Sequence, residues 1–187
     1  MTIQSNPKLI ALDWGTSSFR GWLLDGEGKV LESISADLGI LKVPDQDFQS
    51  VYYQQLNPWF KLHGSVPVIA SGMIGSRQGW VEAPYVACPS ELEELSEQLA
   101  YVPGDSKANR PLLAIVPGMN HWSEGIPDVM RGEETQVFGA MEEEEPPMIF
   151  ILPGTQSPNP RAHTYARIHT HTHTHPHTHT HAHTPAT

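Results

Sequence analysis

The last thirty or so residues differ in composition from everything before them. Nine of the 11 histidines lie between His163 and His183, mostly alternating with threonine, and no acidic residue follows Glu145. A His-Thr repeat has neither the apolar residues nor the periodicity to bury surface, so it cannot offset the entropy lost on ordering its backbone. The sequence therefore predicts disorder from about residue 157 onward and confines the fold to the residues before it.

The part of the chain that can fold is acidic. The whole chain has 21 Asp+Glu against 11 Lys+Arg, a net charge of -10. Without the tail arginines, Arg161 and Arg167, the charge is about -12. Nucleic acid would be repelled and is not an expected partner. The single cysteine, Cys88, cannot form an intramolecular disulfide, and neither a membrane span nor a signal peptide is evident. We expect a cytoplasmic protein that does not bind membranes.

Short apolar runs separated by turn residues predict an α/β fold. The first three predicted strands are joined by tight turns as antiparallel neighbours, and helices alternate with strands after them. Such an order implies a mixed sheet flanked by helices. The strands are expected at 9–12, 19–24, 29–36, 66–70, 112–116 and 148–152, and the helices at 47–62, from Ser90 with Glu93 at capping-box spacing, and at 130–141.

An Asp-x-Gly-Thr segment follows the first predicted strand and leads directly into the second. Asp13 can hold Mg²⁺ through water, Gly15 lets phosphate oxygens approach the backbone, and Thr16 offers a hydroxyl. These residues alone are equally typical of an ordinary strand-end turn in which the aspartate caps neighbouring amides. The order strand, Asp-x-Gly-Thr, strand, glycine-rich turn, strand resembles the first phosphate hairpin of the actin, Hsp70 and sugar-kinase superfamily.

Within that superfamily, four segments resemble the 2-dehydro-3-deoxygalactonokinases, in the order that the family has them. They are ALDWGTSSFRGW at 11–22, SGMIGSRQGW from Ser71 leading into Ala83-Pro84-Tyr85, IVPG at 115–118, and VMRGEETQ at 129–136. The resemblance runs from about residue 9 to 155. It implies an actin-like ATPase (ribonuclease H-like) N-terminal lobe with ATP and Mg²⁺ as cofactors. It also implies transfer of the γ-phosphate to a terminal hydroxyl of 2-dehydro-3-deoxy-D-galactonate in galactonate catabolism.

The resemblance also suggests which residues carry the chemistry. Phosphoryl transfer depends chiefly on positioning and charge neutralisation. Asp13 is the expected metal-linked carboxylate and, with Gly15 and Thr16, the expected ligand of the ATP phosphates. Glu133 or Glu134 is the expected general base, because the catalytic glutamate of exopolyphosphatases in the same superfamily has a similar location. Without the motif, two carboxylates at a helix start would be explained by dipole compensation.

A sugar acid carries a carboxylate and a keto oxygen, so its site should present a positive charge and hydrogen-bond donors. Arg77 lies in the glycine-rich loop 72–79 and Arg131 adjoins the candidate bases; both are preferred to Arg20. For either arginine, the alternative is an exposed side chain or an ion pair with an acidic residue. The other expected substrate-binding residues are Gly72, Met73 and Asn120.

Met148–Leu152 and the Pro-Gly-Thr after it resemble the start of the family's second lobe, with Gly154 and Thr155 expected at the ATP phosphates. The family normally continues into a complementary strand, whereas this chain enters the His-Thr repeat. We therefore expect an N-terminal lobe at 1–147, a truncated start of the second lobe at 148–156, and a disordered tail at 157–187. Activity would then be impaired, and the apolar strand 148–152 would lack a partner and favour a homodimer.

Other interpretations remain open at this stage. The chain is either a member of the kinase lineage, a non-catalytic nucleotide- or partner-binding lobe, or an exopolyphosphatase-like phosphohydrolase. Imidazoles in the tail suit Zn²⁺, Ni²⁺ and Cu²⁺, but without a folded frame they would bind such ions adventitiously. An alternating two-residue repeat is also what a frameshift into repetitive DNA would produce.

Overall fold

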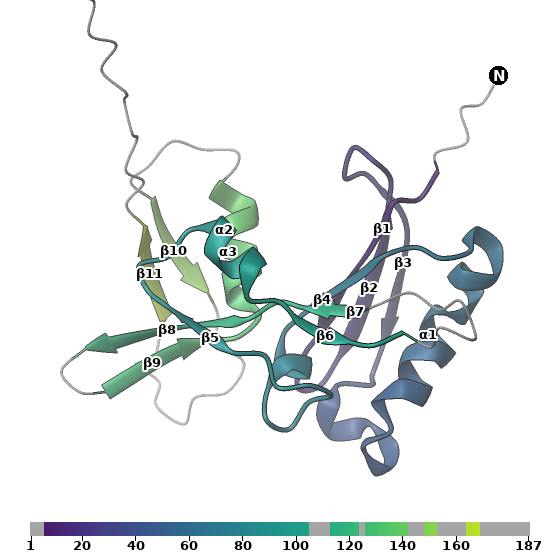
Figure 1. The fold of residues 1–187 in the computed structure, drawn as a ribbon, viewed down its shortest axis with the longest axis horizontal. Coiled ribbons are helices and arrows are strands. Elements are labelled where there is room, and N and C mark those ends of the chain that lie inside the picture. The colour runs from purple at the N-terminus through teal and green to yellow at the C-terminus, as the bar shows by residue number, and fades with distance from the viewer. Residues whose placement is uncertain (1–5, 105–112, 124–125, 142–147, 153–163, 169–187) are drawn as a thin grey trace, which may run out of the picture.

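The structure is a computed structural model that describes residues 6–104, 113–123, 126–141, 148–152 and 164–168. A six-stranded sheet with helix α1 beside it occupies one side of Figure 1, and a three-stranded sheet with helices α2 and α3 occupies the other. A two-stranded sheet lies next to the second group. Within these ranges, no helix has both the length and the apolar character needed to cross a bilayer.

The six-stranded sheet has the order β3-β2-β1-β4-β7-β6. Its strands are β1 (Leu9–Trp14), β2 (Phe19–Leu24), β3 (Val30–Ala36), β4 (Val68–Ser71), β6 (Ala100–Val102) and β7 (Leu113–Ile115). Strands β1, β2 and β3 pair antiparallel, β1 with β4 and β4 with β7 pair parallel, and β6 is antiparallel to β7. The predicted antiparallel trio and the mixed sheet are confirmed, whereas the edge strand β6 was not predicted.

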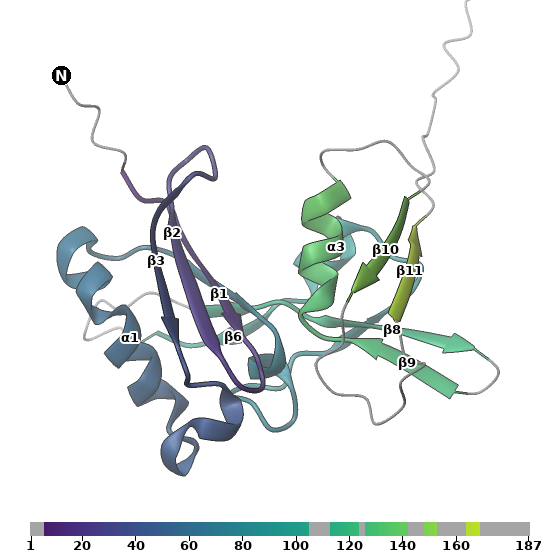
Figure 2. The same cartoon turned by 180° about the vertical axis from the view of Figure 1, so that it is seen from behind.

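Helix α1 (Phe48–His63) covers one face of this sheet (Figure 2). It follows the 3-10 turns Ile40–Lys42 and Pro44–Gln46 and continues through Pro58. Pro58 is exposed, and the apolar side chains around it are buried against the sheet, which offsets the lost backbone hydrogen bond. Because side chains alternate along a strand, the buried members of β1 face the shared core and Asp13 lies on the opposite face. The core residues that make this contact are Ile10, Leu12, Trp14, Val51, Tyr52, Leu56 and Trp59.

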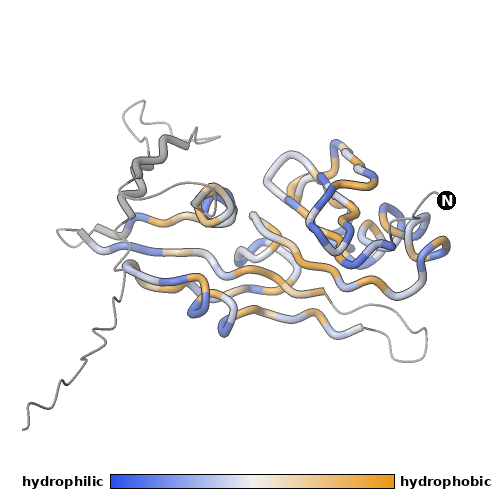
Figure 3. The backbone as a smooth tube through the Cα atoms, turned by 90° about the horizontal axis from the view of Figure 1, so that it is seen from above, coloured by the Kyte–Doolittle hydropathy of each residue, from blue (hydrophilic) through white to orange (hydrophobic). Residues whose placement is uncertain are grey.

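The three-stranded sheet has the order β5-β8-β9. Its strands are β5 (Tyr85–Ala87), β8 (Gly118–Ser123) and β9 (Ile126–Met130), and the helices near it are α2 (Leu92–Glu97) and α3 (Glu133–Met141). Val86, Leu95, Val116 and Met119 form a small core of their own, with Met130 and Phe138 packed against it. Hydrophobic residues recur along the strands of both sheets (Figure 3). Asn120, one of the expected substrate-binding residues, belongs to β8.

Two predicted helix starts are also wrong. Met130 is the last residue of β9 and pairs with Met119, so the chain is extended where a helix was expected. Gly132, with φ +107°, then turns the backbone into α3. For α2, the N-cap is Glu91 and the capping box is closed by Glu94. The sequence pattern pointed one residue too early because Ser90 and Glu93 have the same spacing as the pair that forms the box.

Strand β10 (Met148–Leu152) has a partner, β11 (Thr164–Ile168), and the two pair antiparallel from Met148↔Ile168 to Leu152↔Thr164. The predictions of disorder at 164–168 and of a strand without a partner are therefore wrong. The TYARI segment precedes the strict His-Thr alternation and contains Thr, Tyr and Ile, which favour strands. The remaining tail lies outside the described residues, and the division into domains stays a prediction.

Candidate active site

The turn between β1 and β2 is held by backbone hydrogen bonds. The Gly15 amide donates to the Ser18 carbonyl at 3.0 Å, and the carbonyls of Gly15 and Thr16 accept from the amides of Ile40 and Leu41 at 3.0 and 3.3 Å. The amides of Thr16 and Ser17 donate to no residue in the described part of the chain. A Cβ added at Gly15 would meet nothing closer than 3.9 Å. The turn thus combines a fixed backbone with two amides that have no partner among the described residues, and a Cβ at Gly15 would make only ordinary contacts.

Asp13 lies at the end of β1, opposite Arg20 on β2. The nearest guanidinium nitrogen of Arg20 is 3.5 Å from its carboxylate. Partial burial raises the pKa of Asp13, the positive charge of Arg20 lowers it, and the negative charge of Glu133 raises it. The last effect requires the Glu133 carboxylate to lie near Asp13, so the fold brings together two acidic residues that are far apart in the sequence.

Two glycines allow the segments that carry these carboxylates to meet. Gly72 follows β4 with φ +95°, and a Cβ there would lie 2.9 Å from the Trp14 carbonyl oxygen and 3.4 Å from Oδ1 of Asp13. A Cβ at Gly132 would lie 3.1 Å from the Cα of Gly72. The end of β1, the start of the loop after β4 and the start of α3 therefore touch backbone to backbone.

The first turn of α3 separates its two glutamates. Glu134 is fully buried, and both of its carboxylate oxygens accept from the Gly132 amide, at 2.7 and 2.8 Å. Burial raises the pKa of Glu134 to about 7. Glu133 accepts from the Arg131 amide at 3.0 Å and is half-buried. Thr135 contacts Ser71 of β4, with 3.3 Å between their hydroxyl oxygens. Glu134 thus belongs to the interior, whereas Glu133 is half-buried and close enough for its charge to raise the pKa of Asp13.

The candidate arginines have different environments. Arg131 is buried: Nη2 donates to the Ala83 carbonyl at 2.9 Å and Nε to the Tyr85 hydroxyl at 3.2 Å, with the guanidinium carbon 4.2 Å from the centre of the Tyr85 ring. The Arg77 side chain is 89% exposed, and its nearest carboxylate, on Glu82, is 3.9 Å away. The structure thus places Arg131 beside the candidate base and Arg77 on the surface.

The remaining predicted substrate residues are dispersed. Met73 begins the 3-10 turn η3 (Met73–Gly75) and packs partly buried against the large core. Asn120 lies on β8, and its Oδ1 is buried with no hydrogen-bond partner among the described residues. Gly154 and Thr155 lie outside the described residues. Tyr85 belongs to one of the motif segments, but no local pattern pointed to its contact with Arg131, which lies 46 residues further along the chain.

The donor set limits how a metal ion could be held. Among the described residues, no group of three or more His, Cys, Asp and Glu side chains is arranged to hold an ion. Asp13 offers one carboxylate, with Glu133 nearby. Mg²⁺ commonly binds through one or two carboxylates and completes its shell with phosphate oxygens and water. The residues present therefore fit an ion delivered with a nucleotide.

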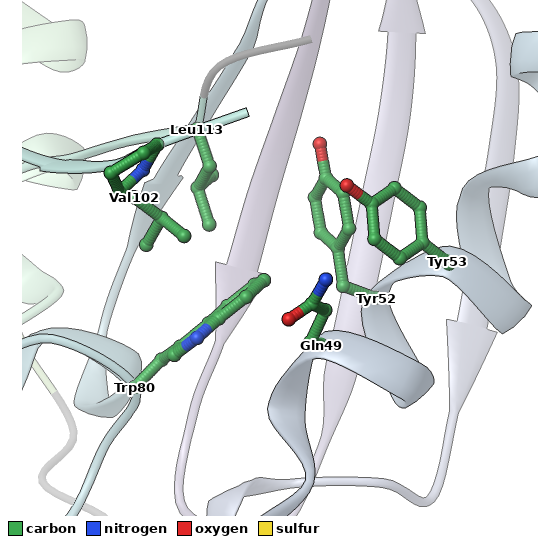
Figure 4. A pocket seen from close by; sticks show the side chains of 7 residues that line it. Gln49, Tyr52, Tyr53, Trp80, Val102 and Leu113 are labelled. Carbon is green, nitrogen blue, oxygen red and sulfur yellow. The ribbon is translucent and has the colours of Figure 1, made fainter. Parts of the chain in front are cut away.

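A pocket of about 310 Å³ lies elsewhere, between α1 and the edge of the large sheet (Figure 4). It contains none of the predicted site residues and lies on the α1 side of the sheet, away from Asp13. Its lining is formed by Gln49, Tyr52, Tyr53, Trp80, Val102, Pro103 and Leu113. The candidate site is thus the meeting of the three segments described above rather than this pocket.

Known proteins resemble the chain in sequence and in structure. A 2-dehydro-3-deoxygalactonokinase of Escherichia coli (strain K12) is 34% identical over 148 residues, which are 79% of this chain and 47% of that protein. A probable 2-dehydro-3-deoxygalactonokinase of Rhizobium meliloti (strain 1021) is 37% identical over 130 residues, 70% of this chain and 41% of that protein. The crystal structure of a putative 2-dehydro-3-deoxygalactonokinase from Sinorhizobium meliloti superposes with a TM-score of 0.69 at 34% identity, covering 79% of this chain and 47% of that one.

The chain thus spans about half the length of the relatives it matches. The family model for 2-keto-3-deoxy-galactonokinase matches residues 13–170. This range includes β10 and β11 and extends beyond residue 155, the expected end of the resemblance. This family model matches most of the length of the chain, and the chain therefore belongs to the 2-keto-3-deoxy-galactonokinase family.

Proposed function

We propose that this chain provides the N-terminal phosphate- and acceptor-binding part of a sugar-acid kinase, which transfers the γ-phosphate of ATP to a terminal hydroxyl of 2-dehydro-3-deoxy-D-galactonate. The meeting of Asp13, the turn at Thr16 and Glu133 carries the proposal. The names of the relatives support the substrate. The order β3-β2-β1-β4-β7, antiparallel and then parallel, supports an actin-like, ribonuclease H-like lobe.

On this proposal, the turn after β1 binds the phosphates. The free amides of Thr16 and Ser17 donate to phosphate oxygens, and Gly15 leaves room for them. Asp13 holds Mg²⁺ through water. When bound, the ion neutralises charge on the β- and γ-phosphates. The partial burial of Asp13 is consistent with this role, because a carboxylate with incomplete hydration gains more from a nearby cation.

Glu133 is the general base, and Glu134 is a positioning residue. A general base must reach the acceptor hydroxyl beside the γ-phosphate. Glu133 is close enough to Asp13 for its negative charge to raise the pKa of Asp13. Glu134 is fully buried with both oxygens on the Gly132 amide, so it fixes the start of α3 instead of meeting substrate. Glu133 accepts the proton of the attacking hydroxyl as the O–P bond forms and ADP leaves.

Arg131 binds the carboxylate of the sugar acid. A buried guanidinium is costly unless its charge is compensated. Within the described residues, Arg131 forms no ion pair with a carboxylate, although the Glu134 carboxyl is near enough for the charge of Arg131 to lower its pKa. An anionic substrate supplies the missing counter-charge.

Because ATP in this superfamily lies between two lobes whose closure excludes water, we propose that full activity also needs the half of the relatives that this sequence does not match.

The first experiment measures Mg·ATP binding to the chain by calorimetry. Asp13→Asn should weaken binding at least about tenfold, the scale of one lost charge-assisted contact. Asp45→Asn is the matched control, because Asp45 is exposed with φ 51°, a conformation that asparagine accepts readily. Equal affinity of wild type and Asp13→Asn would contradict the assignment of Asp13.

The second experiment follows ADP formation with 2-dehydro-3-deoxygalactonate as acceptor. Glu133→Gln should lower turnover by about 10²- to 10⁴-fold while leaving Mg·ATP affinity unchanged. Mg·ATP binding with no turnover by the wild-type chain would support the non-catalytic lobe. Phosphate release from polyphosphate, in place of transfer to the sugar acid, would support the phosphohydrolase.

A further inference from the structure

Tyr85 and Arg131 form a single unit. The phenol oxygen of Tyr85 accepts from Nε of Arg131 at 3.2 Å, and the guanidinium carbon lies 4.2 Å from the ring centroid. Tyr85 is 40% exposed and Arg131 only 9%, so the tyrosine is the solvent-accessible member of the pair and the cation is the buried one. The tyrosine therefore contacts the guanidinium through both its hydroxyl and its ring.

Two glycines make room for this unit. A Cβ at Gly118 would lie 2.6 Å from Cε1 of Tyr85, closer than any side chain permits. A Cβ at Gly75 would lie 2.9 Å from Nη1 of Arg131 and 2.8 Å from Cγ2 of Ile115. The Tyr85 ring can pack on β8 only because residue 118 is a glycine, and the Arg131 guanidinium can pack on η3 only because residue 75 is a glycine.

The hydrogen-bond donors of Arg131 are only partly used. Nε donates to Tyr85 and Nη2 to the Ala83 carbonyl. Nη1 is buried and has no partner among the described residues. Both observed acceptors are uncharged oxygens, so they satisfy donors without neutralising the charge. A buried guanidinium with a free nitrogen is a receptor for an anion.

We propose that Tyr85 is the specificity-determining positioning residue of an anion subsite at Arg131, which takes the carboxylate of a 2-oxo acid through the remaining donors on Nη1 and Nη2. The choice of a 2-oxo acid rests on the proposed function. By occupying Nε, Tyr85 leaves the Nη side of the guanidinium for the ligand. One carboxylate balances one guanidinium.

Pyruvate and methyl pyruvate test the subsite without ATP. Pyruvate carries the 2-oxo carboxylate alone, and its methyl ester has the same keto group without the charge. Titrating each into the full chain, with the Nε–H resonance of Arg131 as the reporter, should show saturable binding of pyruvate. Binding of the ester should be at least tenfold weaker. Equal binding of both compounds, or no shift of the Arg131 resonance up to high millimolar pyruvate, would overturn the proposal.

Substitutions at Tyr85 separate positioning from simple packing. Tyr85→Phe keeps the ring and removes the acceptor of Nε, so the preference for pyruvate over its ester should fall several-fold. Tyr85→Leu removes the ring as well and should reduce the preference further. Tyr101→Phe is the control, because Tyr101 is 53% exposed on β6 and should leave the preference unchanged. A preference that survives Tyr85→Leu in a folded chain would contradict the role of Tyr85.

Gly75→Ala provides a second route to the same question. The added methyl group lies against Nη1 and should weaken pyruvate binding several-fold, with little change for the ester. Gly139→Ala in α3 is its control, since a Cβ there meets nothing within 4 Å. Unchanged pyruvate affinity in a folded Gly75→Ala variant would rule out Nη1 as the binding atom.

These outcomes are distinct from those of the kinase proposal. If pyruvate binds but the sugar acid is not phosphorylated, the subsite proposal is supported and the kinase proposal is contradicted. If wild type and Tyr85→Leu both phosphorylate the sugar acid and discriminate equally against neutral sugars, the kinase proposal is supported. The proposed role of Tyr85 in the subsite is then contradicted.

Discussion

Gly72 and Gly132 lie backbone to backbone, so close that a Cβ at Gly132 would be 3.1 Å from the Cα of Gly72. One follows β4 and the other precedes α3, and both have positive φ, +95° and +107°. Their contact brings the loop after the large sheet to the helix that carries Glu133. The candidate site depends on this approach.

Substituting either glycine should therefore separate these segments. Gly132→Ala adds a methyl group at the contact and strains a backbone that alanine rarely adopts, so the free energy of unfolding should fall by about 1–3 kcal/mol. Chemical denaturation measures the change. Gly139→Ala, within α3 and with open space around it, should instead stabilise the chain by up to about 1 kcal/mol. Equal effects at the two positions would argue against the contact.

Glu134 should make stability depend on pH. Burial raises its pKa from an ordinary 4.5 to about 7 in the folded chain. Between these values the folded state keeps a proton that the unfolded state has released, so the stabilisation is complete below pH 4.5 and is lost as the pH rises toward 7. The loss is on the order of 3 kcal/mol.

Glu134→Gln removes this titration and keeps the shape of the side chain. The difference in unfolding free energy between wild type and variant should shift in favour of the variant as the pH is raised from 4.5 to 7. Urea denaturation at several pH values gives both curves. Parallel curves for the two proteins would show that Glu134 does not titrate in this range.

Tyr52 offers a test of a buried polar atom. Its ring is in the core and lines the pocket in Figure 4, and its hydroxyl is buried without a partner among the described residues. Tyr52→Phe keeps the ring contacts and removes the unsatisfied group, so stability should stay constant or rise by about 1 kcal/mol. Tyr101→Phe, at an exposed site, should change nothing. A loss above about 1 kcal/mol in Tyr52→Phe would mean that its hydroxyl has a hydrogen-bond partner.

The pairing of β10 with β11 predicts different results for two truncations. Ending the chain after Ile168 leaves both strands in place and should not change the association state. Ending it after Gln156 removes β11 and exposes the apolar edge of β10, which should increase self-association. Light scattering at matched concentrations compares them. Equal association of the two truncated chains would contradict the role of β11.

The sequence by itself was sufficient for the elements whose signal is local. The β1–β2–β3 meander and helix α1 follow from apolar periodicity and turn residues within short windows, and the motif segments led to the family. Local patterns were misleading where the same residues suit two structures. Met130 ends a strand because it pairs with Met119, and the TYARI segment forms β11 because β10 lies beside it.

Only the tertiary structure decided which candidates share a site. Arg77 and Arg131 both lie in glycine-containing motif segments, and Glu133 and Glu134 are neighbours of the same type. Yet Arg131 and Glu134 are buried while Arg77 is exposed. Burial and electrostatic proximity depend on contacts between segments far apart in the chain. No local pattern contains those contacts, which is why the sequence indicated the candidate residues and the fold separated those that meet from those that do not.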